Sequence, residues 1–201
     1  MPKHPKRRTR RNLAVLALSA LCLTGFLYWD NTALQVTRFD PVFSDLPAGF
    51  DGCRIVVLSD LHGASFGAHN ADPIVLAGID DPNGYADQKT PEELAAEVYA
   101  ACGDPFWILL AHRNNRFARQ YSLLGADLVC SGHAHGGIVR LPGTDGLFSH
   151  DLDLFPSYTA GLYEENGSVL FVTRGLGNSG PSFRVFNRPE IAVLTLRRAE
   201  G

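Results

Sequence analysis

Three short apolar runs in this sequence are each followed by side chains that metal ions bind. Carboxylate oxygen and imidazole nitrogen together suit Mn, Fe or Zn. The sequence therefore predicts a divalent metal site built from one Asp and four His residues. The runs cover residues 55–58, 107–111 and 127–132, and the predicted ligands after them are Asp60, His62, His112, His133 and His135.

The elements that position these ligands are predicted to be buried strands. Each run is short, rich in Ile, Val and Leu, and bounded by polar residues or glycine, which is typical of a strand buried on both faces. In open α/β sheets, ligands bind beyond the carboxyl ends of the strands. We therefore expect all five side chains to converge at one edge of one sheet. Gly136 and Gly137 after the last pair would permit positive φ and a close backbone approach beside an ion.

The same residues carry a resemblance to the calcineurin-like metallophosphoesterases. That family has five short motifs, D-x-H, G-D, G-N-H, a lone H and G-H-x-H, and this chain matches the first, fourth and fifth. The G-D and G-N-H motifs are missing through an internal gap near residues 68–73, and the similarity resumes at 73–82. The tail, at 174–177 and 184–191, resembles the membrane-anchored bacterial branch, some members of which cleave the pyrophosphate of a lipid A precursor.

The resemblance implies a fold and a cofactor. The expected fold class is α/β, a calcineurin-like metallophosphoesterase sandwich (α/β/β/α) that is internally truncated. Members of the family hold two divalent metal ions, Mn, Fe or Zn. Because the bridging carboxylate of G-D is missing here, we expect this chain to hold one ion or none. Asp80 and Asp81 could replace that carboxylate, although a turn is the simpler role for them.

The resemblance also divides the ligands into two half-sites. One family metal takes the D-x-H pair and the second His of G-H-x-H, which correspond to Asp60, His62 and His135. The other metal takes the lone His and the first His of G-H-x-H, which correspond to His112 and His133. A set of two His and one carboxylate can hold one ion.

The implied activity is metal-dependent hydrolysis of a phosphodiester or pyrophosphate, impaired by the loss of two motifs. The alternative is an inactive membrane-anchored remnant that binds one metal or none. Arg174 and Arg184 could bind the substrate phosphate, with surface or packing roles as the alternative. A membrane anchor favours a lipid-linked phosphoester as the partner.

The N-terminus predicts that anchor. Residues 1–12 form a basic cytoplasmic head with six of the 18 Lys and Arg residues, and residues 13–29 are uncharged and mostly apolar. This pattern indicates a transmembrane anchor or a signal segment, and a single-pass protein of the bacterial cell membrane with its body outside the cytoplasm. A cleaved signal peptide shares the pattern, and Arg10-Arg11 resembles a twin-arginine export signal. A linker over 30–50 and an incomplete metallophosphoesterase domain over 51–198 follow.

Composition and local patterns give the remaining expectations. The net charge is −3 even with the basic head, so the body is acidic and a nucleic-acid surface is not expected. Thr90, Pro91 and Glu93 predict the capped start of a helix. The four cysteines form no framework and are expected to be small buried hydrophobes. Further expected elements are an edge strand at 34–39, a helix at 117–124, and strands at 138–141, 169–173 and 191–196.

Overall fold

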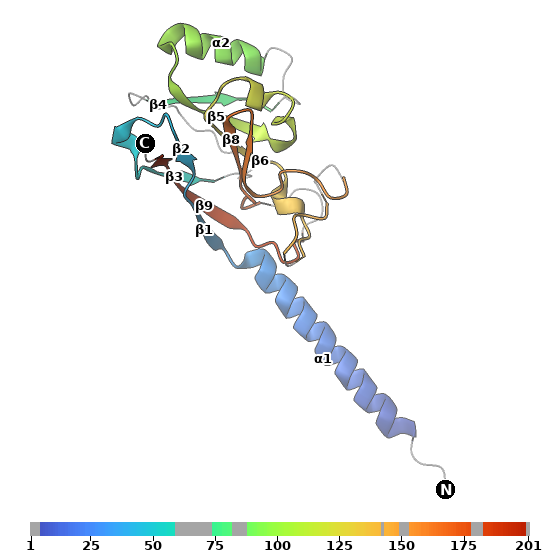
Figure 1. Cartoon of the computed structure of the whole chain (residues 1–201). Coiled ribbons are helices and arrows are strands. Elements are labelled where there is room, and N and C mark those ends of the chain that lie inside the picture. Colours follow the sequence, from blue (N-terminus) through green and yellow to red (C-terminus); the bar gives the residue numbers. More distant parts are fainter. Residues whose placement is uncertain are drawn as a thin grey trace.

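A long helix projects from a body built of two packed β-sheets (Figure 1). The structure is a computed structural model that describes residues 5–58, 74–81, 88–141, 143–148, 153–177 and 183–199. The helix, α1 (Pro5–Thr32), contains a stretch from Arg11 to Thr32 that is long and apolar enough to cross a membrane, with a mean hydropathy of 1.7. None of its most apolar window is buried in the body, which is compatible with a membrane-spanning anchor.

The larger sheet has five strands and carries two of the three predicted metal-site runs. Strands β4, β5, β6 and β8 are parallel to their neighbours, and β7 closes the sheet antiparallel to β8. In spatial order, the sheet comprises β4 (Ile74–Ile79), β5 (Phe106–Arg113), β6 (Leu128–Gly132), β8 (Ser168–Val172) and β7 (Gly161–Glu165).

The smaller sheet has three strands, with β9 in the centre. Strand β1 runs parallel to β9 and β3 runs antiparallel to it. The spatial order is β1 (Gln35–Phe39), β9 (Glu190–Thr195) and β3 (Arg54–Val57), while β2 (Val42–Phe43) pairs separately with β10 (Arg197–Arg198). Short 3₁₀ helices lie at Ala48–Phe50, Asn114–Arg116, Tyr121–Leu123 and His135–Gly137.

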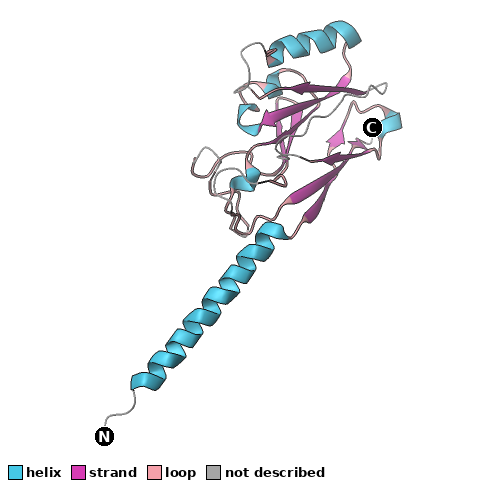
Figure 2. Cartoon of the chain, turned by 180° about the vertical axis from the view of Figure 1, so that it is seen from behind, coloured by secondary structure: helices cyan, strands magenta, loops and turns pink. Residues whose placement is uncertain are grey.

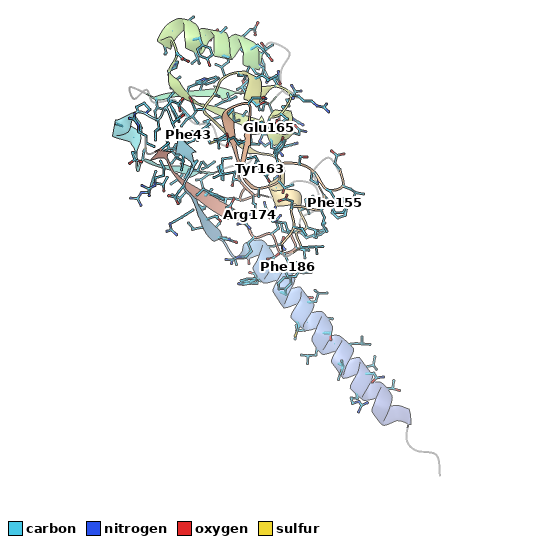
Figure 3. The ribbon with its side chains drawn as sticks, in the orientation of Figure 1. Phe43, Phe155, Tyr163, Glu165, Arg174 and Phe186 are labelled. Carbon is cyan, nitrogen blue, oxygen red and sulfur yellow. The ribbon has the colours of Figure 1, made fainter. Side chains whose placement is uncertain are left out.

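The two sheets pack face to face, and helix α2 (Pro91–Cys102) covers the outer face of the larger one (Figure 2). Between the sheets, Phe106, Ile108 and Phe171 meet Ala192 and Leu194 in one buried cluster. Phe43 also enters this layer, with its ring edge-on to Phe106 at a centroid distance of 5.1 Å (Figure 3). The predicted α/β class and the two-sheet sandwich are thereby confirmed. The layers present in the described residues are helix, sheet and sheet.

Helix α2 begins as its sequence predicts. The Thr90 hydroxyl accepts a hydrogen bond from the backbone N–H of Glu93, and the Glu93 carboxylate accepts one from the backbone N–H of Thr90. This reciprocal capping box satisfies two backbone donors that the helix itself leaves without partners. On the inward face, Ala95 and Val98 pack against Trp107 of β5.

Several expected elements are confirmed and others are wrong. The edge strand near residue 34 is β1, and the later strands are β8 and β9. The helix expected at 117–124 is wrong, because this segment forms turns with one 3₁₀ helix at Tyr121–Leu123. The strand expected at 138–141 is also wrong, since Val139 and Arg140 make only isolated bridges.

The expectation that the three apolar runs belong to one sheet is also wrong. The first apolar run forms β3, which lies in the smaller sheet, whereas the other two runs form β5 and β6 of the larger sheet. An apolar run does not encode which sheet it joins, and β3 finds its partner in β9 through antiparallel pairing. Nor is β3 buried on both faces, because Val56 is 58% exposed.

The cysteines are free thiols. Cys130 is buried in β6 as expected, and burial raises its pKa to about 12. Cys53 is partly buried, but Cys22 and Cys102 are exposed, so the expectation of burial is wrong for these two.

Candidate metal centre

Strands β5 and β6 bring two of the predicted ligands together. His112 is the second-last residue of β5, and His133 directly follows β6, the parallel neighbour of β5. The Nε2 atom of His112 lies 3.2 Å from the Nδ1 atom of His133, and the two rings meet edge to face with centroids 5.0 Å apart. Asp60 and His62 lie outside the described residues, so their placement stays a prediction.

The spacing of these two nitrogens fits a shared metal ion. Ligand nitrogens that each lie about 2.1 Å from one ion are roughly 3.0 to 3.4 Å apart in octahedral or tetrahedral geometry. The observed 3.2 Å falls within this interval. No group of three or more His, Cys, Asp or Glu side chains suited to an ion occurs among the residues that the structure describes. Within the described residues, His112 and His133 are the predicted ligands whose ring nitrogens lie together.

The loop carrying His133 and His135 has an unusual backbone. Both histidines have positive φ, 62° and 47°, which is uncommon outside glycine and is frequent at functional sites. Gly136 and Gly137 follow with φ of 67° and 76°. A Cβ atom on Gly136 would overlap the Asn187 side chain, and one on Gly137 would overlap the Gly146 backbone. The expectation of positive φ at these glycines is confirmed, whereas a close approach beside an ion stays a prediction.

His135 is held in an orientation suited to coordination. Its side chain is buried, and its Nδ1 atom lies 3.1 Å from the carbonyl oxygen of Gly177. Because a carbonyl can only accept, Nδ1 carries the hydrogen and the lone pair of the neutral ring lies on Nε2. Metal-bound histidines are commonly oriented by such a bond to a backbone carbonyl.

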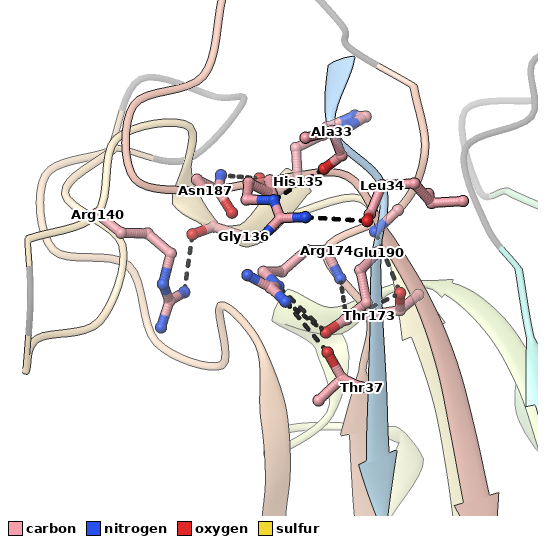
Figure 4. Close-up of polar contacts among 12 residues, drawn as sticks. Ala33, Leu34, Thr37, His135, Gly136, Arg140, Thr173, Arg174, Asn187 and Glu190 are labelled. Carbon is pink, nitrogen blue, oxygen red and sulfur yellow. Dashed lines mark hydrogen bonds and ion pairs between the residues drawn. The ribbon is translucent and has the colours of Figure 1, made fainter. Parts of the chain in front are cut away.

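Two further residues hold the backbone around His135 in place. Arg184 is fully buried and also donates to the Gly177 carbonyl, so it fixes the acceptor that orients His135. The Asn187 side chain donates to the carbonyl of His135 at 2.7 Å and to that of Ile138 at 3.2 Å (Figure 4). The sequence does not show this supporting role of Asn187, because its partners become neighbours only in the fold.

Arg113 is a neighbour of the histidine pair that the sequence analysis missed. Its Nη1 atom lies 3.4 Å from Nε2 of His133, and its Nε atom donates to Asp81 at 3.1 Å. Guanidinium can only donate, so Nε2 of neutral His133 accepts and its Nδ1–H points at His112. Asp81 also faces this site, with its carboxylate 3.8 Å from Nε2 of His112.

Basic and amide side chains line the space beside His133. A cavity of about 310 Å³ opens on His133, Asn115, Arg119 and Tyr158. Asn115 and Arg119 also line an open groove of about 470 Å³. Against the acidic body, this groove gathers positive charge next to the histidines. Its charged residues are three arginines and one glutamate, namely Arg113, Arg116, Arg119 and Glu92.

The arginines expected to bind phosphate have other partners in the structure. Arg174 forms an ion pair with buried Glu190 at 2.8 Å and donates to Thr37 at 3.2 Å (Figure 4). Burial alone would raise the pKa of Glu190, but the Thr37 hydroxyl and Arg174 outweigh it and lower the pKa. Arg184 supports Gly177 as described above. A phosphate-binding role for Arg174 and Arg184 stays a prediction, and their contacts give both of them a structural role.

The end of α1 contacts the segment that supports His135. The Asp30 carboxylate is buried and accepts from the backbone N–H of Asn187 at 3.3 Å. The Asn31 side chain accepts from the Arg184 backbone N–H at 2.6 Å and donates to its carbonyl at 2.9 Å. Helix α1 is therefore linked through Asn187 to the loop of His135.

Sequence comparisons find relatives among the metallophosphoesterases. The chain is 28% identical to an uncharacterized metallophosphoesterase of Aquifex aeolicus over 127 residues, which cover 62% of this chain and 46% of that protein. It is 34% identical to the uncharacterized metallophosphoesterase YkuE of Bacillus subtilis over 92 residues, covering 46% and 31%. A Campylobacter jejuni metallophosphoesterase, also uncharacterized, is 40% identical over 91 residues, covering 45% and 22%. The chain thus spans less than half the length of each of these relatives.

No family model matches the chain, and no solved structure matches it. The relatives, the shared motifs and the two-sheet α/β architecture nevertheless agree with one another. Together they make this chain similar to the metallophosphoesterases over part of its length.

Proposed function

We propose that this protein is a metal-dependent phosphoesterase that hydrolyses a phosphodiester or pyrophosphate bond in a lipid-linked substrate at a membrane surface. The observation that carries the proposal is the 3.2 Å separation of the His112 and His133 nitrogens, which matches two ligands of one ion. His135, which is oriented by the Gly177 carbonyl, is the third histidine of the set. The metal would activate a water molecule and stabilise charge on the phosphoryl oxygens.

The residues around the histidines would bind and orient the substrate. His112 and His133 would hold one ion, while Asp60, His62 and His135 would hold the other. The guanidinium groups of the groove would attract the anionic ester, and Arg can bind phosphate through two parallel hydrogen bonds. The cavity on His133 and Tyr158 would accept the alcohol portion.

The lipid-linked character of the substrate is supported by the anchor. Asp30 near the end of α1 contacts Asn187, and Asn187 contacts the backbone of His135. If α1 crosses a bilayer, the site lies close to its surface. The basic head before α1 favours a cytoplasmic N-terminus and a body outside the cytoplasm.

A second candidate function is that of an anchored remnant that binds one metal ion or none. It is favoured by the missing G-D and G-N-H motifs. In a two-metal site the bridging carboxylate holds the ions at the separation that clamps the reacting oxygens. Without that carboxylate, one ion would bind at the stronger half-site.

Metal analysis and turnover measured on one purified preparation discriminate the two functions. Two ions per chain with hydrolysis of an activated aryl phosphodiester support the enzyme, and one or no ion without hydrolysis supports the remnant. We expect the set of Asp60, His62 and His135 to bind more tightly. Asp60→Ala and His135→Ala should then each abolish binding of the more tightly held ion, whereas His112→Ala should not. Loss of all metal in His112→Ala, with none lost in Asp60→Ala, would reverse the assignment of the half-sites.

A further inference from the structure

The side of the body from which α1 leaves carries large apolar side chains that are exposed. Phe155 is 74% exposed and Phe186 is 51% exposed. Figure 3 shows Phe186 beside the base of the helix and Phe155 on the flank toward which the helix projects. We call this set the apolar rim, and its members are Phe148, Leu154, Phe155, Phe183 and Phe186.

The rim is continuous with the candidate membrane helix. The ring of Phe186 packs against Phe26 of α1, with centroids 5.3 Å apart. Phe26 lies inside the apolar stretch that ends at Thr32, about 9 Å along the helix axis from that end at 1.5 Å per residue. A side chain that contacts Phe26 therefore lies at a depth that lipid would reach.

Backbone hydrogen bonds connect Phe186 to the rest of the rim. The amide of Arg140 donates to Val185, that of Leu147 donates to Val139, and that of Phe155 donates to Leu147. These three hydrogen bonds connect neighbouring extended segments. At about 4.8 Å between hydrogen-bonded segments, the rim spans roughly 15 Å. Its parts are thus held together as one surface.

The two most prominent rings are held outward by an unfavourable backbone. Phe155 has φ of 51° and Phe186 has φ of 52°. Positive φ in a bulky residue is a steric outlier that persists only where the surrounding structure enforces it. Exposing an aromatic ring to water at such a position has no stabilising effect on the body itself, which indicates that the ring has an external partner.

We propose that the apolar rim inserts into the headgroup boundary of the bilayer that α1 crosses. Aromatic side chains are enriched at this depth, and Tyr28 and Trp29 of α1 lie at the same end of the helix. Insertion buries the rings at the boundary of headgroups and acyl chains. It also keeps the loop of His133 and His135 at the membrane surface. The lipid-linked substrate of the proposed function would then reach the site without leaving the bilayer.

Site-specific photocrosslinking to lipid tests this proposal. The full chain is reconstituted in phospholipid vesicles with a photoreactive benzoylphenylalanine in place of Phe155, Phe186, Leu21 or Leu123. Leu21 reports on the anchor. Leu123 is the matched control, because it is 66% exposed but lies next to Leu124, whose carbonyl contacts Tyr99 of α2 at the far end of the body. Mass spectrometry then identifies phospholipid adducts.

Adducts at 155, 186 and 21 with none above background at 123 are expected. Adducts at 21 without any at 155 and 186 would overturn the rim while leaving the anchor intact. Equal adducts at 123 and 155 would overturn it as well, as would the absence of adducts at all four positions. The measurement is made with a chelator present, so its outcome does not depend on metal binding or on phosphoesterase activity.

Discussion

Arg113 and a bound metal ion would favour different tautomers of His133. As the structure stands, Nε2 of His133 faces a guanidinium donor 3.4 Å away. When an ion binds Nδ1 of a neutral imidazole, the hydrogen moves to Nε2 and would point at that donor. The positive charge of Arg113 also repels a divalent cation. Arg113 is therefore expected to weaken metal binding at the His112 and His133 pair while it strengthens binding of an anionic substrate.

Replacing this guanidinium separates the two effects. Arg113→Gln removes the charge and offers an amide oxygen that can accept from Nε2 of His133. We expect the affinity of this half-site for Mn²⁺ to rise roughly tenfold, or about 1.4 kcal/mol. Isothermal titration calorimetry measures it, with Arg38→Gln on the exposed face of β1 as control. An unchanged or weakened Mn²⁺ affinity in Arg113→Gln would refute the competition.

At the scale of elements, the sequence predicted those features that depend on residues close together in the chain. The capping box of α2 and the strands β1, β8 and β9 follow from patterns within one segment. The segment after His112 shares the apolar spacing of a helix, but its tertiary contacts select turns instead. Ser122 is buried and its hydroxyl accepts from the Asn166 side chain, a partner 44 residues away.

Long-range pairing limited the prediction of the site in the same way. The pairing of His112 with His133 follows from two parallel neighbouring strands, and the sequence predicts that both histidines follow strands. The position of β3 in a second sheet does not follow from its composition. The supporting contacts of Asn187, Arg113 and Asp30 depend on segments that are remote in the chain.

Asp127 lies just before β6, and its carboxylate contacts Trp107 of β5 and Asp45 in the segment after β2. Its carboxylate accepts from the backbone N–H of Trp107 at 2.6 Å. Burial and a hydrogen bond with Asp45 raise its pKa to about 7. An aspartate has a pKa of about 3.9 in an unfolded chain, so the folded state binds the extra proton between about pH 4 and about pH 7. The contribution of this group to stability is thus present at acidic pH and falls as the pH rises toward 7.

Asp127→Asn should remove this dependence on pH. The amide keeps an acceptor for Trp107 and gains a fixed donor for Asp45, without a charge. We expect the variant to unfold at a higher temperature than the parent chain at pH 8 and at a similar temperature at pH 5. Thermal unfolding followed by circular dichroism at the two values tests this. A stabilisation of equal size at pH 5 and pH 8 would show that Asp127 is not the titrating group.

At the scale of the whole molecule, large apolar side chains lie exposed on the smaller sheet and along a cleft between the sheets. Val36 of β1 and Val56 of β3 are 50% and 58% exposed on the smaller sheet. A cleft of about 370 Å³ separates the sheets between β3 and β4, lined by Ile55, Leu76 and Leu110 among others. On its far side, β3 has no neighbouring strand among the described residues. We expect the segment predicted to be missing from this chain to pack on this surface.

Restoring that segment should restore activity. General acid catalysis alone contributes roughly 100- to 10,000-fold, so a chain without the G-N-H histidine should hydrolyse an aryl phosphodiester barely above background with Mn²⁺. Insertion of the corresponding segment of a full-length relative between Asn70 and Pro73 should recover turnover. The two proteins are compared at equal metal loading.

A short chain that already turns over as fast as the restored one would contradict this. Asp81 would then be the first residue to test as the replacement carboxylate, since it faces His112.

Orientation in the membrane is a separate property of the whole chain. The six basic residues before Leu13 predict a cytoplasmic N-terminus. A reporter that is active only outside the cytoplasm, fused after Gly201, should be active. The matched control is the same fusion with the six basic residues replaced by Gln. An inactive parent fusion, together with an active cytoplasmic reporter at the same position, would invert the topology.

The docking of α1 onto the body has a kinetic consequence. Asp30 and Asn31 bind the segment at 184–187, and the guanidinium of Arg188 lies over the Trp29 ring at 4.8 Å. If α1 spans a membrane, a body held to it by these contacts stays next to the bilayer surface. Substrate would then arrive by lateral diffusion, and the rate would follow its mole fraction in the membrane. Diluting the substrate with inert lipid at constant total amount should therefore slow the reaction, although the bulk concentration is unchanged.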